Sequence, residues 1–109
     1  MVSKASIPDD IKQQTIAIVK QFNRISMHAP RDYYALRFRG RFAYLDRCQH
    51  GRVYQACRLE YGGGMEKWGF AIYKYSRNAY DPEEFWFPGS ECVDGTVEGA
   101  LKAAREAYP

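Results

Sequence analysis

Arginine is concentrated in one part of this 109-residue sequence. Residues 24–58 contain eight arginines and no lysine, and their only acidic residues are Asp32 and Asp46. Residues 1–60 carry eleven Lys or Arg against five Asp or Glu, a net +6, whereas residues 61–109 carry five against eight, a net −3. A guanidinium group binds phosphate or carboxylate through paired hydrogen bonds and also stacks on aromatic rings. The arginine block therefore favours an anionic partner.

Acidic residues of the chain offer a second explanation for the same arginines. The carboxylates in question follow the arginine block and are Asp81, Glu83, Glu84, Glu91 and Asp94. If the fold brings them onto the arginines, the guanidinium groups are used internally. If it does not, the guanidinium groups remain available to a partner, and the sequence leaves both possibilities open.

The arginines alternate with aromatic residues in a predicted β-hairpin over residues 33–47, with its turn at Gly40. With a two-residue turn, one face carries four side chains of interest: Arg37, Arg39, Phe42 and Tyr44. With a three-residue loop, Phe42 and Tyr44 turn into the core and this face loses its aromatic residues. Arg-Gly-Arg is not a strong hairpin-turn sequence, so the register stays open.

A sheet face that combines arginine with aromatic rings is typical of proteins that stack bases and bind phosphates. The candidate nucleic-acid-binding residues are Arg37, Arg39, Arg41, Phe42, Tyr44, Arg47 and Arg52. Arginine–aromatic pairs also stabilise ordinary sheet surfaces through cation–π contacts. We expect a non-catalytic module that binds an anionic partner, with nucleic acid as the preferred partner.

Other functional patterns are less complete. Cys48 and His50 are close in sequence, but a structural zinc site needs four ligands, and the Gly62–Gly64 run lacks the lysine of a phosphate-binding loop. We therefore expect no metal, no cofactor and no catalytic residue.

One alternative to nucleic-acid binding is a protein-interaction module or homodimer that uses an exposed sheet face or edge. Another is a small-ligand site or enzyme built from the aromatic and acidic residues 78–94.

Two amphipathic helices are predicted at the two ends of the chain. Ser6 is the expected N-cap of the first helix, which should end near Ser26, ahead of Pro30. Its apolar face consists of Ile11, Ile18, Phe22 and Ile25. Asp94 or Thr96 should cap the last helix. Its apolar stripe consists of Val97, Ala100, Leu101, Ala104 and Tyr108.

Four or five strands are predicted between the helices, over residues 33–39, 42–47, 52–61, 67–75 and, as a short edge strand, 84–87. Short connections make consecutive strands antiparallel neighbours. The predicted fold is α+β, with an antiparallel sheet in meander order and the N-terminal and C-terminal helices on one face. At this length we expect residues 1–109 to form a single domain.

The cysteine content and the start of the sequence indicate a cytoplasmic protein. Three widely spaced cysteines, Cys48, Cys57 and Cys92, do not suggest a disulfide framework. The first residues lack the apolar run of a secretion signal, and no apolar stretch is long enough to span a bilayer.

Residues 52–109 resemble a family of small uncharacterised bacterial proteins. The segments that carry the resemblance are Cys57–Tyr61, Lys67–Ser76, Tyr80–Gly89 and Asp94–Ala100. The resemblance implies a short cytoplasmic bacterial protein without an assigned activity, and it transfers no catalytic residue.

The order of elements is also similar in topology to double-stranded RNA-binding domains. This chain has an extra strand, however, and residues 97–99 lack the basic cluster such domains present to phosphates.

Overall fold

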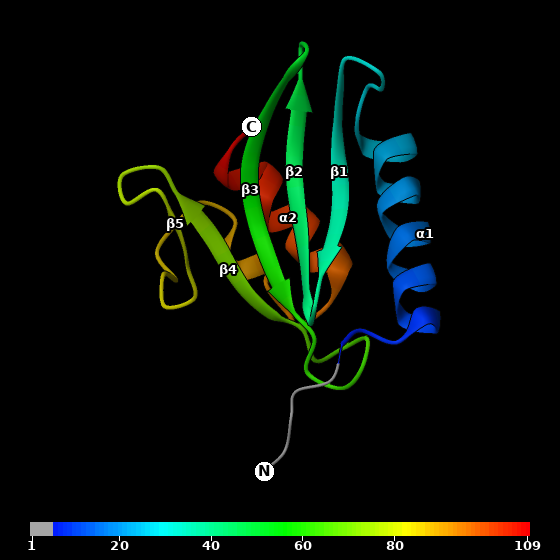
Figure 1. The fold of residues 1–109 in the computed structure, drawn as a ribbon. Helices are drawn as coiled ribbons and strands as arrows, with labels where there is room; N and C mark the ends of the chain where they lie inside the picture. The colour runs from blue at the N-terminus through cyan, green and yellow to red at the C-terminus, as the bar shows by residue number, and fades with distance from the viewer. Residues whose placement is uncertain (1–5) are drawn as a thin grey trace.

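The computed structural model describes residues 6–109 and shows an antiparallel meander sheet with a helix at each end of the chain (Figure 1). The elements are α1 (Asp9–Ser26), β1 (Asp32–Arg39), β2 (Phe42–Gln49), β3 (Arg52–Glu60), β4 (Gly69–Lys74), β5 (Ala79–Asp81), the 3-10 helix η1 (Ser90–Cys92) and α2 (Val97–Ala107). Each strand pairs with the next one in sequence. The predicted fold class is confirmed. None of the helices within residues 6–109 has the length and apolar character that crossing a membrane requires.

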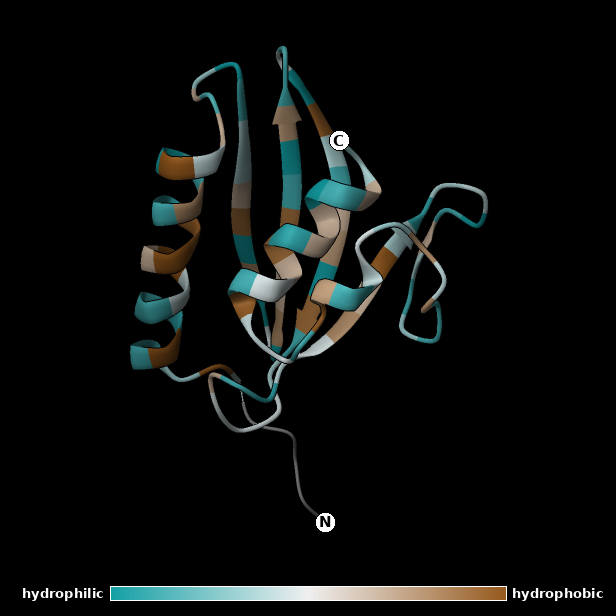
Figure 2. Cartoon of the chain, turned by 180° about the vertical axis from the view of Figure 1, so that it is seen from behind, coloured by the Kyte–Doolittle hydropathy of each residue, from teal (hydrophilic) through white to brown (hydrophobic). Residues whose placement is uncertain are grey.

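The two helices and one face of the sheet enclose the core. Figure 2 shows α2 lying across the central strands, with α1 beside β1, and the two helices contact one another. Leu45 and Leu59 of the sheet are fully buried against Val97 and Leu101 of α2. Figure 1 is seen from the other side, where no described helix lies over the strands. This second side is called the open face below.

The turn between β1 and β2 selects one of the two predicted registers. Arg39 pairs with Phe42, and Arg37 pairs with Tyr44, so the turn contains two residues. Gly40, the first of the two, has φ 60°. A two-residue hairpin turn of type II′ needs a positive φ at this position, which glycine adopts without steric cost. Phe42 and Tyr44 consequently remain on the open face instead of entering the core.

Several local predictions are confirmed and others are wrong. The Thr96 hydroxyl caps α2 by accepting a hydrogen bond from the Gly99 N–H, as predicted. Pro8, not Ser6, occupies the N-cap position of α1, and no side chain caps this helix. Residues 84–87 form no strand, because the Glu84 carboxylate accepts a hydrogen bond from the Trp86 N–H and folds the segment into a loop. The fifth strand is Ala79–Asp81 instead.

A side chain of α1 binds the backbone of one residue at the outer edge of β1. The Asn23 side-chain amide donates a hydrogen bond to the Tyr34 carbonyl oxygen over 2.9 Å, and its oxygen accepts one from the Tyr34 N–H over 2.8 Å. This amide therefore takes the place that a neighbouring strand would occupy. Exposed strand edges promote pairing between chains, so the contact both stabilises the helix–sheet junction and limits aggregation.

Replacement of Asn23 should measure what this contact contributes. We expect Asn23→Ala to lower the free energy of unfolding by about 1–3 kcal/mol, because both Tyr34 backbone groups lose their partner. Asn23→Asp keeps an acceptor for the Tyr34 N–H and should cost less than Asn23→Ala. Urea denaturation measures both values, with Gln13→Ala on the exposed side of α1 as the control. Equal stability of Asn23→Ala and Gln13→Ala would contradict the assigned role.

Candidate nucleic-acid interface

Residues from four strands build a continuous arginine–aromatic surface on the open face. The surface consists of Arg37 and Arg39 from β1, Phe42 and Tyr44 from β2, Arg58 from β3 and Tyr80 from β5. Tyr44 lies at its centre, because it pairs with Arg37 on one side and with Arg58 on the other. The strand pairing thus brings four of the predicted residues together, and it adds Arg58 and Tyr80, which the sequence reasoning missed.

Guanidinium groups stack on the rings of this surface. The Arg37 Cζ atom lies 4.3 Å from the centre of the Tyr44 ring. The Arg58 Cζ atom lies 4.6 Å from the Phe42 ring centre and 5.4 Å from that of Tyr80. The Tyr44 and Tyr80 rings meet edge to face at 5.5 Å. Such stacking is favourable and leaves the N–H donors at the rim of each guanidinium free to form further hydrogen bonds.

Arg37 and Arg41 are each paired with a carboxylate of a neighbouring strand. Arg37 Nε lies 2.8 Å from the Oδ2 atom of Asp46, a buried carboxylate, and this hydrogen bond raises the pKa of Arg37. Arg41 Nη2 lies 2.6 Å from Glu60 Oε2. These two positive charges are therefore compensated within the fold. Arg37 nonetheless keeps 49% of its side chain exposed, so its outer edge remains accessible.

Arg39 and Arg58 supply the uncompensated charge of the surface. Arg39 is exposed, and Arg58 is half-buried between aromatic rings. Within residues 6–109, no carboxylate forms an ion pair with either of them. The surface can therefore offer an anion two free guanidinium charges and the outer edge of a third.

Arg47 does not belong to this surface, contrary to the sequence prediction. Strand alternation places it two residues after the buried Leu45, on the helix-covered side, where it is 6% exposed. Its Nε and Nη2 atoms bind the two carboxylate oxygens of Asp32 over 2.5 and 2.8 Å, and its Nη1 atom donates to the Tyr108 carbonyl oxygen over 2.7 Å. Arg47 therefore joins β1, β2 and the end of α2.

Arg52 also lies away from the arginine–aromatic surface. It pairs with Gln49 next to the β2–β3 turn, and strand alternation places both on the same side of the sheet as Arg47. Its side chain is exposed. Of the seven predicted residues, four thus lie on the open face, Arg47 and Arg52 lie on the other side of the sheet, and Arg41 lies in the β1–β2 turn.

The acidic residues that follow the arginine block interact elsewhere. Glu84 Oε2 lies 2.6 Å from Lys74 Nζ, and Asp81 Oδ2 lies 3.2 Å from Arg77 Nη1. Asp94 accepts hydrogen bonds from Thr96. The counter-charges of the arginine block come instead from its own strands.

The cysteines are free thiols in this structure. Cys57 is buried, which raises the pKa of its thiol and keeps it protonated, whereas Cys48 and Cys92 are partly exposed. In the part of the chain from residue 6 onward, no three His, Cys, Asp or Glu side chains lie close enough to share a metal ion. Cys48 and His50 therefore lack the further ligands that a zinc site requires.

Comparisons with known proteins identify no relative of this chain. No protein-family model matches the sequence, and neither the curated proteins nor the solved structures yield a match. The resemblance of residues 52–109 to small bacterial proteins stays a prediction.

Replacement of Asp32 should show that Arg47 has a structural role. We expect Asp32→Asn to lower the free energy of unfolding by about 3–5 kcal/mol at neutral pH, because it leaves a buried guanidinium without its counter-charge. The hydrogen bond from Arg47 lowers the pKa of Asp32, so this stabilisation is present above the unfolded carboxylate pKa of about 4 and is lost as the pH falls further. The difference between wild type and variant should therefore shrink in acid.

Chemical denaturation across pH provides the measurement, with Glu106→Gln on the exposed side of α2 as the control. A loss of less than about 1 kcal/mol for Asp32→Asn, the range of an exposed ion pair, would show that Arg47 is not held as described.

Proposed function

We propose that this protein binds single-stranded nucleic acid on its open face and acts without catalysis. The observation that carries the proposal is the stacking of Arg37 and Arg58 on three aromatic rings, on the side of the sheet that no described helix covers. Phosphate and base recognition need cationic and flat apolar groups next to one another, and this surface supplies both.

The geometry favours a single strand because unpaired bases can stack on the partly exposed rings and on the guanidinium planes beside them, whereas the bases of a duplex are stacked inside it. Tyr44 and Phe42 form the proposed stacking platform. Arg39 and Arg58 are the proposed phosphate contacts. Arg37, whose charge Asp46 compensates, holds the Tyr44 ring in place and offers its outer edge as a hydrogen-bond donor.

The small number of free cations predicts a modest dependence of affinity on salt. If Arg39 and Arg58 neutralise two phosphates, the logarithm of the binding constant should fall with the logarithm of the salt concentration with a slope of about −1.4.

We further propose a cytoplasmic location, where thiols such as those of Cys48 and Cys92 remain reduced.

The alternative of an active site or ligand site in residues 78–94 has less support. Asp81 and Glu84, two of its carboxylates, are held by Arg77 and Lys74. The neighbouring cavity lined by Pro82 and Phe85 has a volume of about 280 Å³, and the one lined by Glu84 and Trp86 about 220 Å³. Both are smaller than most ligand pockets, which have volumes of about 300–1,000 Å³.

Binding of fluorescent oligouridylate and oligothymidylate at low salt should test the proposed function. We expect Tyr44→Leu to weaken binding by about 1–3 kcal/mol, the contribution of one stacked base. Arg58→Ala should weaken binding and flatten the salt dependence, because one phosphate contact is lost. Lys20→Ala, which removes an exposed charge of α1, serves as the matched control and should bind as wild type does.

The same titration with a duplex of matched length separates the proposed mode from general attraction to negative charge. Absence of binding, tighter binding to the duplex, or equal losses for Arg58→Ala and Lys20→Ala would each contradict the proposal.

A further inference from the structure

The N-terminal half of β3 has no neighbouring strand on its outer side. β3 pairs with β4 only from Cys57 to Glu60, opposite Gly69–Ile72. In the preceding segment, Arg52–Ala56, the residues Arg52–Gln55 pair with β2 alone among the described strands, and Ala56 is an unpaired bulge residue. Figure 1 shows β4 turning away from β3 at this point. This segment is called the β3 edge below.

The hairpin geometry determines which backbone groups of the β3 edge face outward. His50 and Gly51 form a two-residue turn, and Gln49 and Arg52 are the pair that flanks it. Such a flanking pair exchanges both of its hydrogen bonds, and hydrogen-bonded pairs then alternate along the ladder. Val53 and Gln55 therefore direct their N–H and C=O groups away from β2. The Gln55 carbonyl accepts a hydrogen bond from the Tyr75 hydroxyl over 2.7 Å, which is consistent with this direction.

The outer edges of β1 and β5 are less open to a further strand than the β3 edge. Asn23 occupies the Tyr34 backbone groups at the edge of β1. β5 contains three residues and is followed by Pro82, and both a short length and a proline discourage strand pairing. At the β3 edge the Tyr75 hydroxyl occupies the Gln55 carbonyl, but no hydrogen bond among the described residues occupies the outward N–H and C=O of Val53 or the Gln55 N–H. Val53 is 68% exposed.

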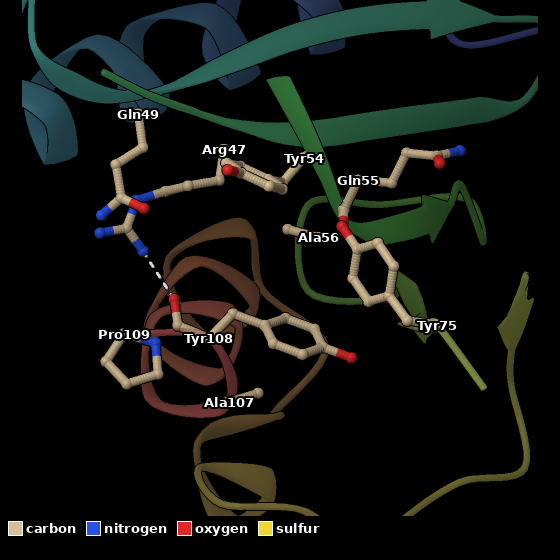
Figure 3. A pocket seen from close by; sticks show the side chains of 9 residues that line it. All are labelled: Arg47, Gln49, Tyr54, Gln55, Ala56, Tyr75, Ala107, Tyr108 and Pro109. Atoms are coloured by element: carbon tan, nitrogen blue, oxygen red, sulfur yellow. Dashed lines mark hydrogen bonds between the residues drawn. The ribbon is translucent and has the colours of Figure 1, made fainter. Parts of the chain in front are cut away.

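A cavity of about 450 Å³ opens beside the β3 edge (Figure 3). Tyr54, Gln55 and Ala56 line one side of it, and Tyr75 and Tyr108 line the other. The two tyrosine rings meet edge to face at 5.6 Å. The hydrogen bond from Arg47 to the Tyr108 carbonyl, drawn in Figure 3, holds the end of α2 against the sheet. None of the residues that line the cavity is acidic.

We propose that the β3 edge binds an extended peptide segment of a partner protein, which adds a strand beside Val53 and Gln55. Backbone hydrogen bonds supply affinity in this mode, and a pocket beside the edge selects side chains. The cavity takes an apolar or aromatic side chain of the peptide. An acidic residue of the peptide faces Arg52, which is exposed on the same side of the sheet.

Charge argues for a peptide of another protein rather than a second copy of this chain. Arg52–Ala56 contains one positive charge and no acidic residue, so an edge-to-edge pair of two copies would supply no carboxylate to either Arg52. The proposed site is also separate from the arginine–aromatic surface, because the cavity lies on the helix-covered side. A negative result in the peptide-binding experiment therefore leaves the nucleic-acid proposal intact, and a negative result with nucleic acid leaves the peptide proposal intact.

The probe is the synthetic peptide TEVFVET with blocked ends, whose symmetric sequence allows either strand direction. Its two glutamates lie on the same face of an extended strand as its phenylalanine, as a cavity and an Arg52 on one side of the sheet require. Fluorescence anisotropy measures its binding to the full chain. Two comparison peptides test the two parts of the proposal. TEVGVET lacks the side chain for the cavity, and a version N-methylated at its central residues keeps all side chains but cannot donate backbone hydrogen bonds. Each should bind at least about tenfold more weakly than TEVFVET, because each loses about 1.4 kcal/mol or more.

Two substitutions test the position on the protein. Val53→Pro removes an outward N–H at a strand edge, where proline is tolerated, and should abolish binding of TEVFVET. Val53→Thr keeps both the N–H and the branched side chain and should bind as wild type does. Should Val53→Pro fail to fold, slowed hydrogen exchange of the Val53 and Gln55 amides in the wild-type chain on addition of TEVFVET reports the same contact.

No binding of TEVFVET, or equal binding of its N-methylated version, would overturn the proposal. A dimer by light scattering, with the Val53 amide protected from exchange before any peptide is added, would also overturn it in favour of a second copy at this edge.

Discussion

The two-residue turn between β1 and β2 is the constraint on which the surface described above depends. A shift of one residue would exchange the two faces of β1 relative to β2 and move Phe42 and Tyr44 into the core. The positive φ of Gly40 permits the short turn, and neighbouring backbone anchors it. The Ile7 N–H donates to the Gly40 carbonyl and the Tyr61 N–H donates to the Arg41 carbonyl. The turn is thus held from both sides by segments distant in sequence.

Strand alternation then gives the arginines different roles. Arg47 falls on the helix-covered side and, through Asp32 and the Tyr108 carbonyl, ties the end of α2 to the sheet. Arg37 falls on the open face, where Asp46 fixes it against Tyr44. Arg39 and Arg58 are left with uncompensated charge among the described residues. Arginines of the same part of the sequence therefore have two different roles. Those on the helix-covered side hold the fold together, and those on the open face form part of the exposed surface.

Much of the fold could be predicted because helical periodicity, capping and short turns are local signals. The order of elements and the Thr96 cap follow from such signals, and the alternation of Leu45 and Arg47 already contained the information that Arg47 is buried. Arg58 and Tyr80 could not be placed, because their position depends on an extra residue, Ala56, in β3 and on the pairing of β5. The Asn23 contact joins two elements through one side chain and leaves no periodic pattern in the sequence.

The most direct test of the arginine–aromatic surface is an NMR titration of the isotope-labelled chain with oligouridylate at low salt. Our account predicts the largest shift changes at the backbone amides of Phe42, Tyr44 and Tyr80 and at the Nε–H groups of Arg37 and Arg58, with α1 and α2 unaffected. Shift changes confined to the helices or to the β3 edge, with the arginine Nε–H signals unmoved, would contradict it.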